Sequence, residues 1–400
     1  MSCWWHRIGQ DVRGFQTSFN CLRHHPFDFF HVPICSIKAL FSIQTHNGLG
    51  IERSRLLTSG ISPAVVCTIL ASRRPSTIRS YQGTWKAFST WCSKSNINPE
   101  RAEVPDVLRF LQDGLQMGIR PNTLKRQASA LTSVLQVQGA PSLASHELVK
   151  RFLRGATTLS PPVKHHFPMW NLHTVLSALQ KPPFEPLSSS SLRILSFKII
   201  FLIAITTARK ISELQALSVD KHLCVFHKDR VVLRTNPTFI PKVNSPFHSQ
   251  QDIILPSFCP HPTHPRERAW HSLDVRRALK IYINRTRPFR RSLFISFHPA
   301  TLGQKVSVAT LAQWIKACIS LAYETLHLTS PLHITAHSTR SAATSAAFST
   351  NAPIADICRE ATWFSPTTFT RHYKIDLYAS AEASFGRRVL QQVLPSSIPP

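Results

Sequence analysis

The chain has 400 residues, enough for about two domains, and its apolar fraction of 43% is sufficient for a buried core. It holds 47 Lys and Arg residues against 20 Asp and Glu residues, and the net charge of +27 favours a polyanionic partner such as nucleic acid. No signal peptide, lipidation motif, basic amphipathic anchor or membrane-spanning run stands out, so a membrane partner is not expected.

Residues 1–60 show no lasting hydrophobic period, and we expect a poorly ordered extension there. Helical periodicity begins near residue 61. Four helices are predicted: one with an apolar stripe from Ile78 to Cys92, one beginning at Pro105, one ending at Gly139, and one over about 142–154. They predict a small helical domain over 61–158. Its candidate DNA-binding cations are Lys86, Arg120, Lys125 and Arg126.

A stretch rich in Pro, Ser and Thr over 159–170 indicates a linker. A second domain is predicted over 171–390, with helices at about 170–181 and 190–208 and again from Val306 onward. The short β-branched runs "RVVLRTN" and "DIILPS" predict strands between them. Residues 391–400 form a loose tail by composition. The predicted fold class is therefore mainly α with a small β-sheet.

Nine Cys residues are scattered along the chain and none forms a Cys-x2-Cys pair, which is typical of reduced thiols in an intracellular protein. Cys259, His261, His264 and His271 gather in a Pro-rich stretch. Their spacing matches no standard zinc pattern, so a solvated loop is favoured over a metal site.

The stretches "ITAHSTRSAATSAAF" and "TWFSPTTFTRHYKID" carry the most informative chemistry. His337 and Arg340 are three residues apart and share a face if they are helical, and Tyr373 follows in a basic run. Cations beside a tyrosine suit phosphoryl transfer to its hydroxyl, because negative charge develops on the phosphate oxygens. The alternative is a core histidine, a surface arginine and a tyrosine on a helix face.

The stretches "TTARKISELQAL", "AHSTR" and "FTRHYKID", in this order, resemble the conserved boxes of tyrosine recombinases, which are site-specific DNA strand-transfer enzymes. The runs "LRTNPTFIPKVNSPFH" and "HSTRSAATS" are most similar to the recombinases of DIRS-like retrotransposons. The resemblance covers about residues 75–385. It implies a helical, SAM-like core-binding domain and a mixed α/β catalytic domain that bind double-stranded DNA. It also implies self-association on DNA, a nuclear location and no cofactor.

Carried over by position, the resemblance implies that Tyr373 is the nucleophile and forms a 3′-phosphotyrosyl intermediate, in preference to Tyr378. His337 would assist proton transfer and hold the phosphate, and Arg340 would bind a non-bridging oxygen.

Two further roles are implied with open alternatives. Trp363 would donate a hydrogen bond to the phosphate, although a plain core tryptophan is nearly as well supported. Lys242 would be the general acid that protonates the leaving oxygen, although a lysine beside a proline in a loop is usually just solvated.

The first box departs from the family pattern. Counting back from Glu213 puts Lys210, not Arg209, at the position where the family has its catalytic arginine. Lysine offers a point charge, whereas arginine offers a planar fork that binds two phosphate oxygens. Arg209 would reach the site only if the helix is shifted, and otherwise pairs with Glu213.

Three functions are therefore weighed. The first is a recombinase of retrotransposon origin, and the second is an impaired or repurposed DNA-binding protein with the same fold. The third, an unrelated basic nucleic-acid binder, predicts low-complexity basic tails that the sequence does not have.

Overall fold

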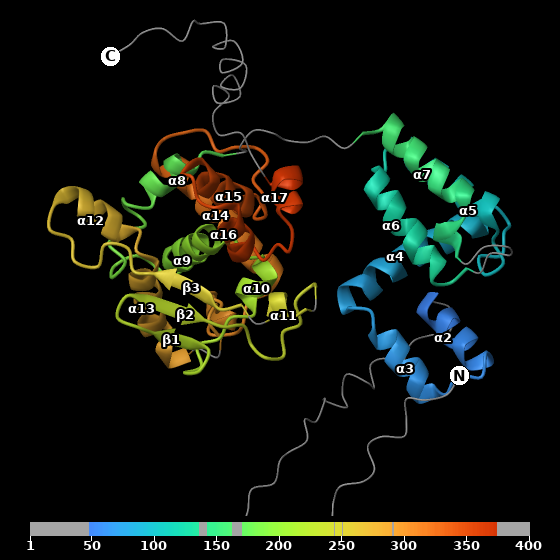
Figure 1. The fold of residues 1–400 in the computed structure, drawn as a ribbon, viewed down its shortest axis with the longest axis horizontal. Coiled ribbons are helices and arrows are strands. Elements are labelled where there is room, and N and C mark those ends of the chain that lie inside the picture. The colour runs from blue at the N-terminus through green and yellow to red at the C-terminus, as the bar shows by residue number, and fades with distance from the viewer. Residues whose placement is uncertain are drawn as a thin grey trace, which may run out of the picture. The chain divides into compact units, whose positions relative to one another are not determined.

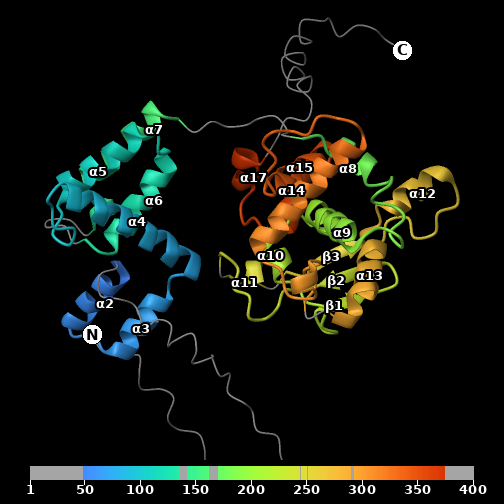
Figure 2. The ribbon, with the colours of Figure 1, turned by 180° about the vertical axis from the view of Figure 1, so that it is seen from behind.

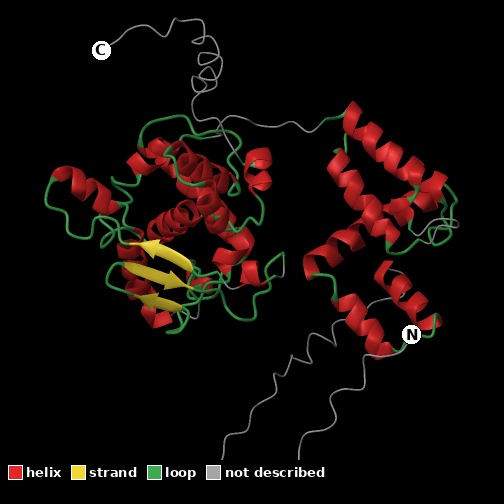
Figure 3. Cartoon of the chain, in the orientation of Figure 1, coloured by secondary structure: helices red, strands yellow, loops and turns green. Residues whose placement is uncertain are grey.

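The computed structural model describes residues 48–135, 142–161, 170–243, 245–249, 251–289 and 292–373. The chain divides into two compact units, unit 1 over residues 1–163 and unit 2 over residues 164–400 (Figure 1). Within the described ranges, Figure 3 shows that unit 1 contains helices only and that the strands lie in unit 2. The division falls within the stretch predicted as a linker, of which 162–169 lie outside the described residues.

Unit 1 is a helical bundle around a small apolar core. Its elements are α2 (Gly48–Thr58), α3 (Pro63–Ala71), α4 (Pro75–Lys94), α5 (Val104–Gln116), α6 (Pro121–Thr132), the 3-10 helix η1 (Leu143–Ser145) and α7 (Glu147–Leu159). A proline lies in the first turn of α3, α4, α5 and α6. In the first turn the fixed φ of proline suits the helix, and no intrahelical hydrogen bond is lost because N–H groups there have no intrahelical acceptor. Phe88, Leu111, Leu124 and Leu131 are fully buried in the core.

The start of unit 1 corrects the sequence prediction. Poor order over 1–60 is wrong for Gly48–Thr58, which forms α2, while residues 1–47 lie outside the described part. The apolar face of α2 is weak, so tertiary partners hold it. Gly48 packs so close to Trp85 that an added Cβ would lie 2.9 Å from the Trp85 Cγ. Arg55 donates hydrogen bonds to the carbonyls of Ser133 and Val134 at 3.0 and 2.7 Å.

Two helix ends in unit 1 also differ from the prediction. The helix expected to run to Gly139 ends at Thr132 in the structure, and residues 136–139 lie outside the described part. The helix expected over 142–154 is displaced and extends to Leu159 as α7.

Unit 2 contains the rest of the described elements. They are α8 (Leu172–Ala178), α9 (Leu192–Thr207), α10 (Ile211–Gln215), β1 (Cys224–Phe226), β2 (Arg230–Leu233), α11 (Pro246–Ser249), β3 (Ile253–Pro256), α12 (Pro265–Ser272), α13 (Val275–Thr286), η2 (Arg287–Phe289), η3 (Pro299–Thr301), α14 (Val308–Thr325), α15 (Ser338–Ser349), α16 (Ile354–Glu360) and α17 (Pro366–His372).

Helix α9 is the centre of unit 2, and it contacts α13, α14, α15 and strand β3 (Figures 1 and 2). It is buried almost all round, as expected for a helix that is apolar on every face. The three strands form an antiparallel sheet in the order β1-β2-β3, with Val232 opposite Val225 and Ile254. The fold class predicted from the sequence, mainly α with a small sheet, is confirmed. None of the described helices has both the length and the apolar character to span a membrane.

One charged side chain is buried inside this core. Lys198, in α9, is 0% exposed and lies 2.7 Å from both the Glu185 carboxylate and the carbonyl oxygen of Leu179. Glu185 also accepts hydrogen bonds from Arg277 of α13 at 3.0 and 3.2 Å. Burial lowers the pKa of Lys198 to about 8, against the opposing attraction of Glu185. The carboxylate thus joins α9 and α13 through two cations.

We predict that Glu185→Gln lowers the free energy of unfolding of unit 2 by about 3–5 kcal/mol, because it leaves a buried cation without its counter-charge. Urea denaturation of the full chain measures this change. The control is Asp229→Asn, whose carboxylate pairs with Arg230 on the exposed surface, and it should leave the unfolding midpoint unchanged. Equal stability of both variants would contradict a structural role for the buried pair.

Candidate active site

A hydrogen bond joins the two residues at the centre of the site. His337 is the N-cap residue of α15, and Tyr373 directly follows α17. The Tyr373 hydroxyl lies 2.7 Å from Nε2 of His337, and the ring centroids are 5.3 Å apart. The Ser345 hydroxyl donates to the Tyr373 carbonyl at 3.0 Å, which ties the end of α17 to α15. Residues far apart in sequence therefore bring the hydroxyl and the imidazole together.

The pKa shifts of this pair keep both side chains uncharged at neutral pH. Partial burial of the ring lowers the pKa of His337, and the positive charges of Arg340 and Lys210 lower it further. Burial raises the pKa of Tyr373, and the charge of Arg340 opposes that rise. The imidazole is thus neutral at pH 7 and available to accept the proton of the hydroxyl.

Arg340 is buried beneath the same aromatic rings. Its residue is 2% exposed, and its guanidinium carbon lies 5.1 Å from the Trp363 ring centroid and 5.6 Å from that of Tyr373. One guanidinium nitrogen, Nη2, donates to the Ala361 carbonyl at 2.6 Å. Nε and Nη1 are buried and have no hydrogen-bond partner among the described residues. Burial lowers the pKa of Arg340. Unpaired charged donors in such a position can bind an anion.

Arg209 and Lys210 diverge because the backbone turns sharply between α9 and α10. Ala208 ends α9 in the left-handed region, with φ +48°, and Lys210 is the N-cap residue of α10. Arg209 is buried, and its Nη2 donates to the Asp252 carbonyl at 3.3 Å and contacts the Gln251 side chain at 3.5 Å. Its Nε has no partner among the described residues.

Lys210 faces the histidine side of the site. Its Nζ lies 3.4 Å from Glu213 Oε1, and its side chain is 27% exposed. The alternative that Arg209 pairs with Glu213 is wrong as a direct contact, since the carboxylate bonds to Lys210. The charge of Lys210 lowers the pKa of His337, whereas the charge of Arg209 acts on Arg340. The two neighbouring cations therefore have different partners, the Asp252 carbonyl for Arg209 and the Glu213 carboxylate for Lys210.

The other residues of unit 2 that the sequence predicted for the site differ in their burial and contacts. Trp363 is buried and packs on Tyr373 with ring centroids 4.4 Å apart, so it shares the apolar cluster beneath the nucleophile candidate. Lys242 is exposed in the connection from β2 to β3, and its side chain makes no hydrogen bond or ion pair with any described residue. Tyr378 lies outside the described residues.

The structure adds two residues that the sequence interpretation did not assign to the site. Glu213 is buried, and its Oε2 has no hydrogen-bond partner in the described chain. His248 of α11 lies near Lys210 and Glu213. Partial burial and the charge of Lys210 lower the pKa of His248, while Glu213 and a hydrogen bond to the Thr362 backbone oppose this. Glu213 stands in the first box and His248 in "SPFH", so both lay within stretches that already carried the resemblance.

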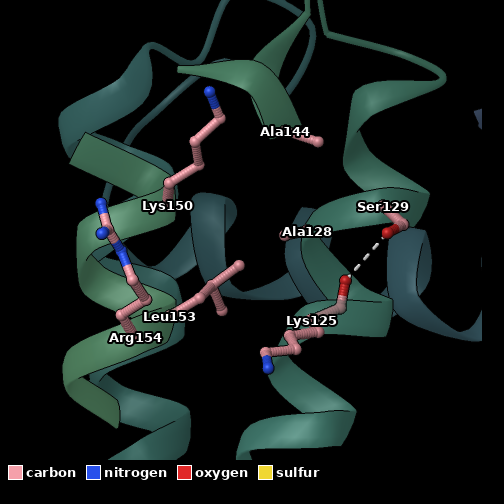
Figure 4. A pocket seen from close by; sticks show the side chains of 7 residues that line it. All are labelled: Lys125, Ala128, Ser129, Ala144, Lys150, Leu153 and Arg154. Atoms are coloured by element: carbon pink, nitrogen blue, oxygen red, sulfur yellow. Dashed lines mark hydrogen bonds between the residues drawn. The ribbon is translucent and has the colours of Figure 1, made fainter. Parts of the chain in front are cut away.

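The four cations predicted to bind DNA, Lys86, Arg120, Lys125 and Arg126, are all exposed in unit 1. Lys125 lies at a cavity of about 570 Å³ between α6 and α7, which is drawn in Figure 4. Lys150 and Arg154 of α7 also line it, and Ala128, Ala144 and Leu153 supply apolar contacts. The sequence interpretation did not include the two cations of α7. They belong to a helix whose far face packs on the core.

The Cys259 loop holds no metal-type cluster. Nδ1 of His271 donates to the Cys259 carbonyl at 2.8 Å, so the backbone rather than the thiol is its partner. In the described part of the chain, no three His, Cys, Asp or Glu side chains gather closely enough to hold a metal ion.

Solved structures share this arrangement of elements. The XerH site-specific recombinase bound to palindromic difH substrate, in a post-cleavage complex, matches with a TM-score of 0.52 at 14% identity, over 89% of this chain and 91% of that chain. The same recombinase in a pre-cleavage complex with difH matches with a TM-score of 0.50 at 14% identity, over 87% and 92%. The chain has the tyrosine-recombinase fold.

Sequence comparisons do not extend this result. No protein-family model matches the chain, and no curated protein matches it either. The tyrosine-recombinase fold thus rests on the three-dimensional arrangement, because an identity of 14% is too low to carry individual residues across.

We predict that His337 titrates below the ordinary histidine pKa of about 6.5. Lys210→Gln should raise the pKa of His337, because it removes a nearby positive charge. The pKa of His337 is lower in the folded state than in the unfolded state, so the unfolded state binds more protons at acid pH. The free energy of unfolding therefore falls as the pH drops below about 6.5. NMR titration of the imidazole measures the shift. Lys228→Gln, at an exposed lysine, is the matched control. An unchanged His337 pKa in Lys210→Gln would show that Lys210 does not face the imidazole.

Proposed function

We propose that this chain is a site-specific DNA recombinase that cuts and rejoins DNA through a 3′-phosphotyrosyl intermediate, and that it derives from a DIRS-like retrotransposon. The observation that carries the proposal is the 2.7 Å contact between Tyr373 and His337 beside a buried Arg340 with two unpartnered nitrogens. A hydroxyl, a proton acceptor and an anion-binding cation are the groups that phosphoryl transfer to tyrosine needs. The tyrosine-recombinase fold and the sequence boxes support the same reaction.

In the proposed reaction the Tyr373 oxygen attacks the scissile phosphorus while its proton passes to Nε2 of His337. Negative charge then develops on the non-bridging oxygens, where Arg340 and Lys210 can stabilise it. As the bond from phosphorus to the 5′ oxygen breaks, Lys242 supplies the proton that the leaving oxygen takes up. A second strand's 5′ hydroxyl reverses the step, so no cofactor is required.

Access to Arg340 sets a condition on this reaction. The Trp363 and Tyr373 rings cover its guanidinium, and its free nitrogens are buried. A phosphate must therefore displace at least one ring before it reaches them. We infer that DNA binding shifts Tyr373 away from Arg340 and toward the phosphorus, and that the pairing with His337 holds the hydroxyl ready before DNA arrives.

Double-stranded DNA is the proposed partner. The net charge of +27 favours a polyanion, and Lys125, Lys150 and Arg154 offer contacts to DNA phosphates from unit 1. The XerH complex holds a palindromic DNA. Palindromic DNA matches two copies of a protein related by a two-fold axis, so we propose that this chain also self-associates on its DNA. We also propose a nuclear location, because the proposed substrate is the DNA of a host that carries such elements.

One observation favours a second candidate function. Lys210 occupies the position of the first-box arginine, and a lysine cannot bind two phosphate oxygens in one plane. An impaired or repurposed DNA-binding protein with this fold would retain the basic surface and lose strand cleavage. The two candidates differ in whether a covalent adduct forms.

We expect wild-type protein to form a covalent adduct with nicked suicide duplexes drawn from a pool with randomised arms, because the nick lets the cleaved end diffuse away. Denaturing electrophoresis followed by sequencing of the bound DNA detects the adduct and identifies the preferred site. Tyr373→Phe should abolish the adduct, whereas Tyr378→Phe, the rival tyrosine, should leave it intact. Salt-sensitive DNA binding without any adduct would support the second candidate instead.

We expect Lys210→Arg to increase the rate of adduct formation by roughly tenfold to a hundredfold, because the planar fork restores a second bond to the phosphate. Timed quenching on the selected duplex measures the rate. Lys228→Arg makes the same exchange at an exposed lysine and serves as the control. No gain in Lys210→Arg would mean that Lys210 together with the buried Arg209 already supplies what the reaction needs.

A further inference from the structure

The connection between β2 and β3 carries Lys242 but does not fix it directly. Lys242 is exposed, as are its apolar neighbours Ile240 and Val243. A general acid must be held within hydrogen-bond reach of the oxygen that it protonates. Some other part of the connection must therefore hold Lys242 in place if it acts in the proposed reaction.

The connection is anchored at its two ends. At the first end, the Asn236 N–H donates to the Ala216 carbonyl at 2.8 Å, which ties the exit of β2 to the end of α10. Near the second end, the Ser245 hydroxyl lies 2.8 Å from Nδ1 of His248, which braces the short helix α11. Lys242 lies between these anchors, so the position of α11 limits where Lys242 can reach.

Helix α11 in turn attaches to the loop between α16 and α17. The Phe247 ring meets the Phe364 ring edge-on, with centroids 6.2 Å apart at 85°. The Thr362 backbone also acts on the His248 ring, because it opposes the lowering of the His248 pKa. Thr362 and Phe364 flank Trp363, whose ring packs on Tyr373. The segment with the proposed acid is thereby joined to the segment beneath the proposed nucleophile.

The backbone at Thr362 marks this loop as constrained. Thr362 has φ +52°, in the left-handed region that a β-branched residue seldom adopts. Its N–H and that of Trp363 bond back to the carbonyls of Arg359 and Cys358 at 3.1 and 2.8 Å, which closes the end of α16. A conformation of this kind persists where the surroundings over-determine it. The loop is therefore a firm base for α11.

We propose that Phe247 and His248 are positioning residues that hold Lys242 at the scissile phosphate by anchoring its segment to the loop at 362–364. The inference rests on the proposed function. In the step concerned, the bond from the Tyr373 oxygen to phosphorus forms and the bond from phosphorus to the 5′ oxygen breaks. His337 takes the Tyr373 proton, and Lys242 gives a proton to the 5′ oxygen.

A sulfur-substituted duplex distinguishes a variant that has lost the position of the general acid from a variant whose whole active site is damaged. In this duplex sulfur replaces the 5′ bridging oxygen, and the thiolate leaves without protonation because thiols have a pKa near 8.5. On the unmodified duplex, here called the oxygen duplex, Phe247→Ala and His248→Ala should each slow adduct formation by roughly 10- to 100-fold. This is part of the rate that is lost when a general acid is removed altogether. On the sulfur duplex both variants should react within about twofold of wild type, which also shows that they are folded.

Two controls complete the experiment. Phe258→Ala removes another partly exposed phenylalanine from an aromatic pair, with Trp270, at the α12 end of unit 2 away from α11 (Figure 2), and it should leave both rates unchanged. The double variant Lys242→Ala with Phe247→Ala should be no slower than Lys242→Ala alone, because both act on one proton transfer.

Three outcomes would overturn the inference. Equal slowing of Phe247→Ala and His248→Ala on both duplexes would assign these residues a structural role. Rates equal to wild type on the oxygen duplex would mean that the anchor does not hold Lys242. Additive losses in the double variant would mean that the two sites act separately. If wild-type protein forms no adduct with either duplex, it is the proposed function that fails.

Discussion

The burial of Arg340 is the constraint on which the site depends. A guanidinium removed from water needs partners, and within the described part of the chain this one makes a single hydrogen bond, to the Ala361 carbonyl. The Trp363 and Tyr373 rings cover it, and this cover keeps Tyr373 near His337. The same carbonyl belongs to the loop that supports α11. One buried cation thus organises the nucleophile candidate, its proton acceptor and the loop beneath both.

Positive charge exceeds negative charge around Arg340, and an anion would balance the excess. Arg209 adds positive charge near Arg340, while the buried carboxylate of Glu213 adds negative charge there and pairs with Lys210 at 3.4 Å. Several buried polar atoms of these residues have no partner among the described residues. A phosphate would neutralise excess charge and complete bonds that the free protein leaves open.

Sequence patterns predicted parts of the fold well where the local signal was strong. The apolar run of α9 and the β-branched runs of β2 and β3 lie where periodicity and composition put them. Helix α2 was missed because its apolar face is weak and Arg55 and Gly48 hold it through contacts distant in sequence. Strand β1 was missed because three residues give too short a pattern, and pairing with β2 alone defines it.

The sequence by itself determined the chemical groups of the site and their order, since His337, Arg340 and Tyr373 are recognisable from motif and spacing. Only the tertiary structure decided which cation faces which group. The left-handed turn at Ala208 sends Arg209 into the core toward Asp252 and leaves Lys210 beside Glu213. Spacing along a helix cannot predict this separation, because it arises where the helix ends. The role of α11 likewise depends on contacts between segments more than a hundred residues apart, which no local pattern encodes.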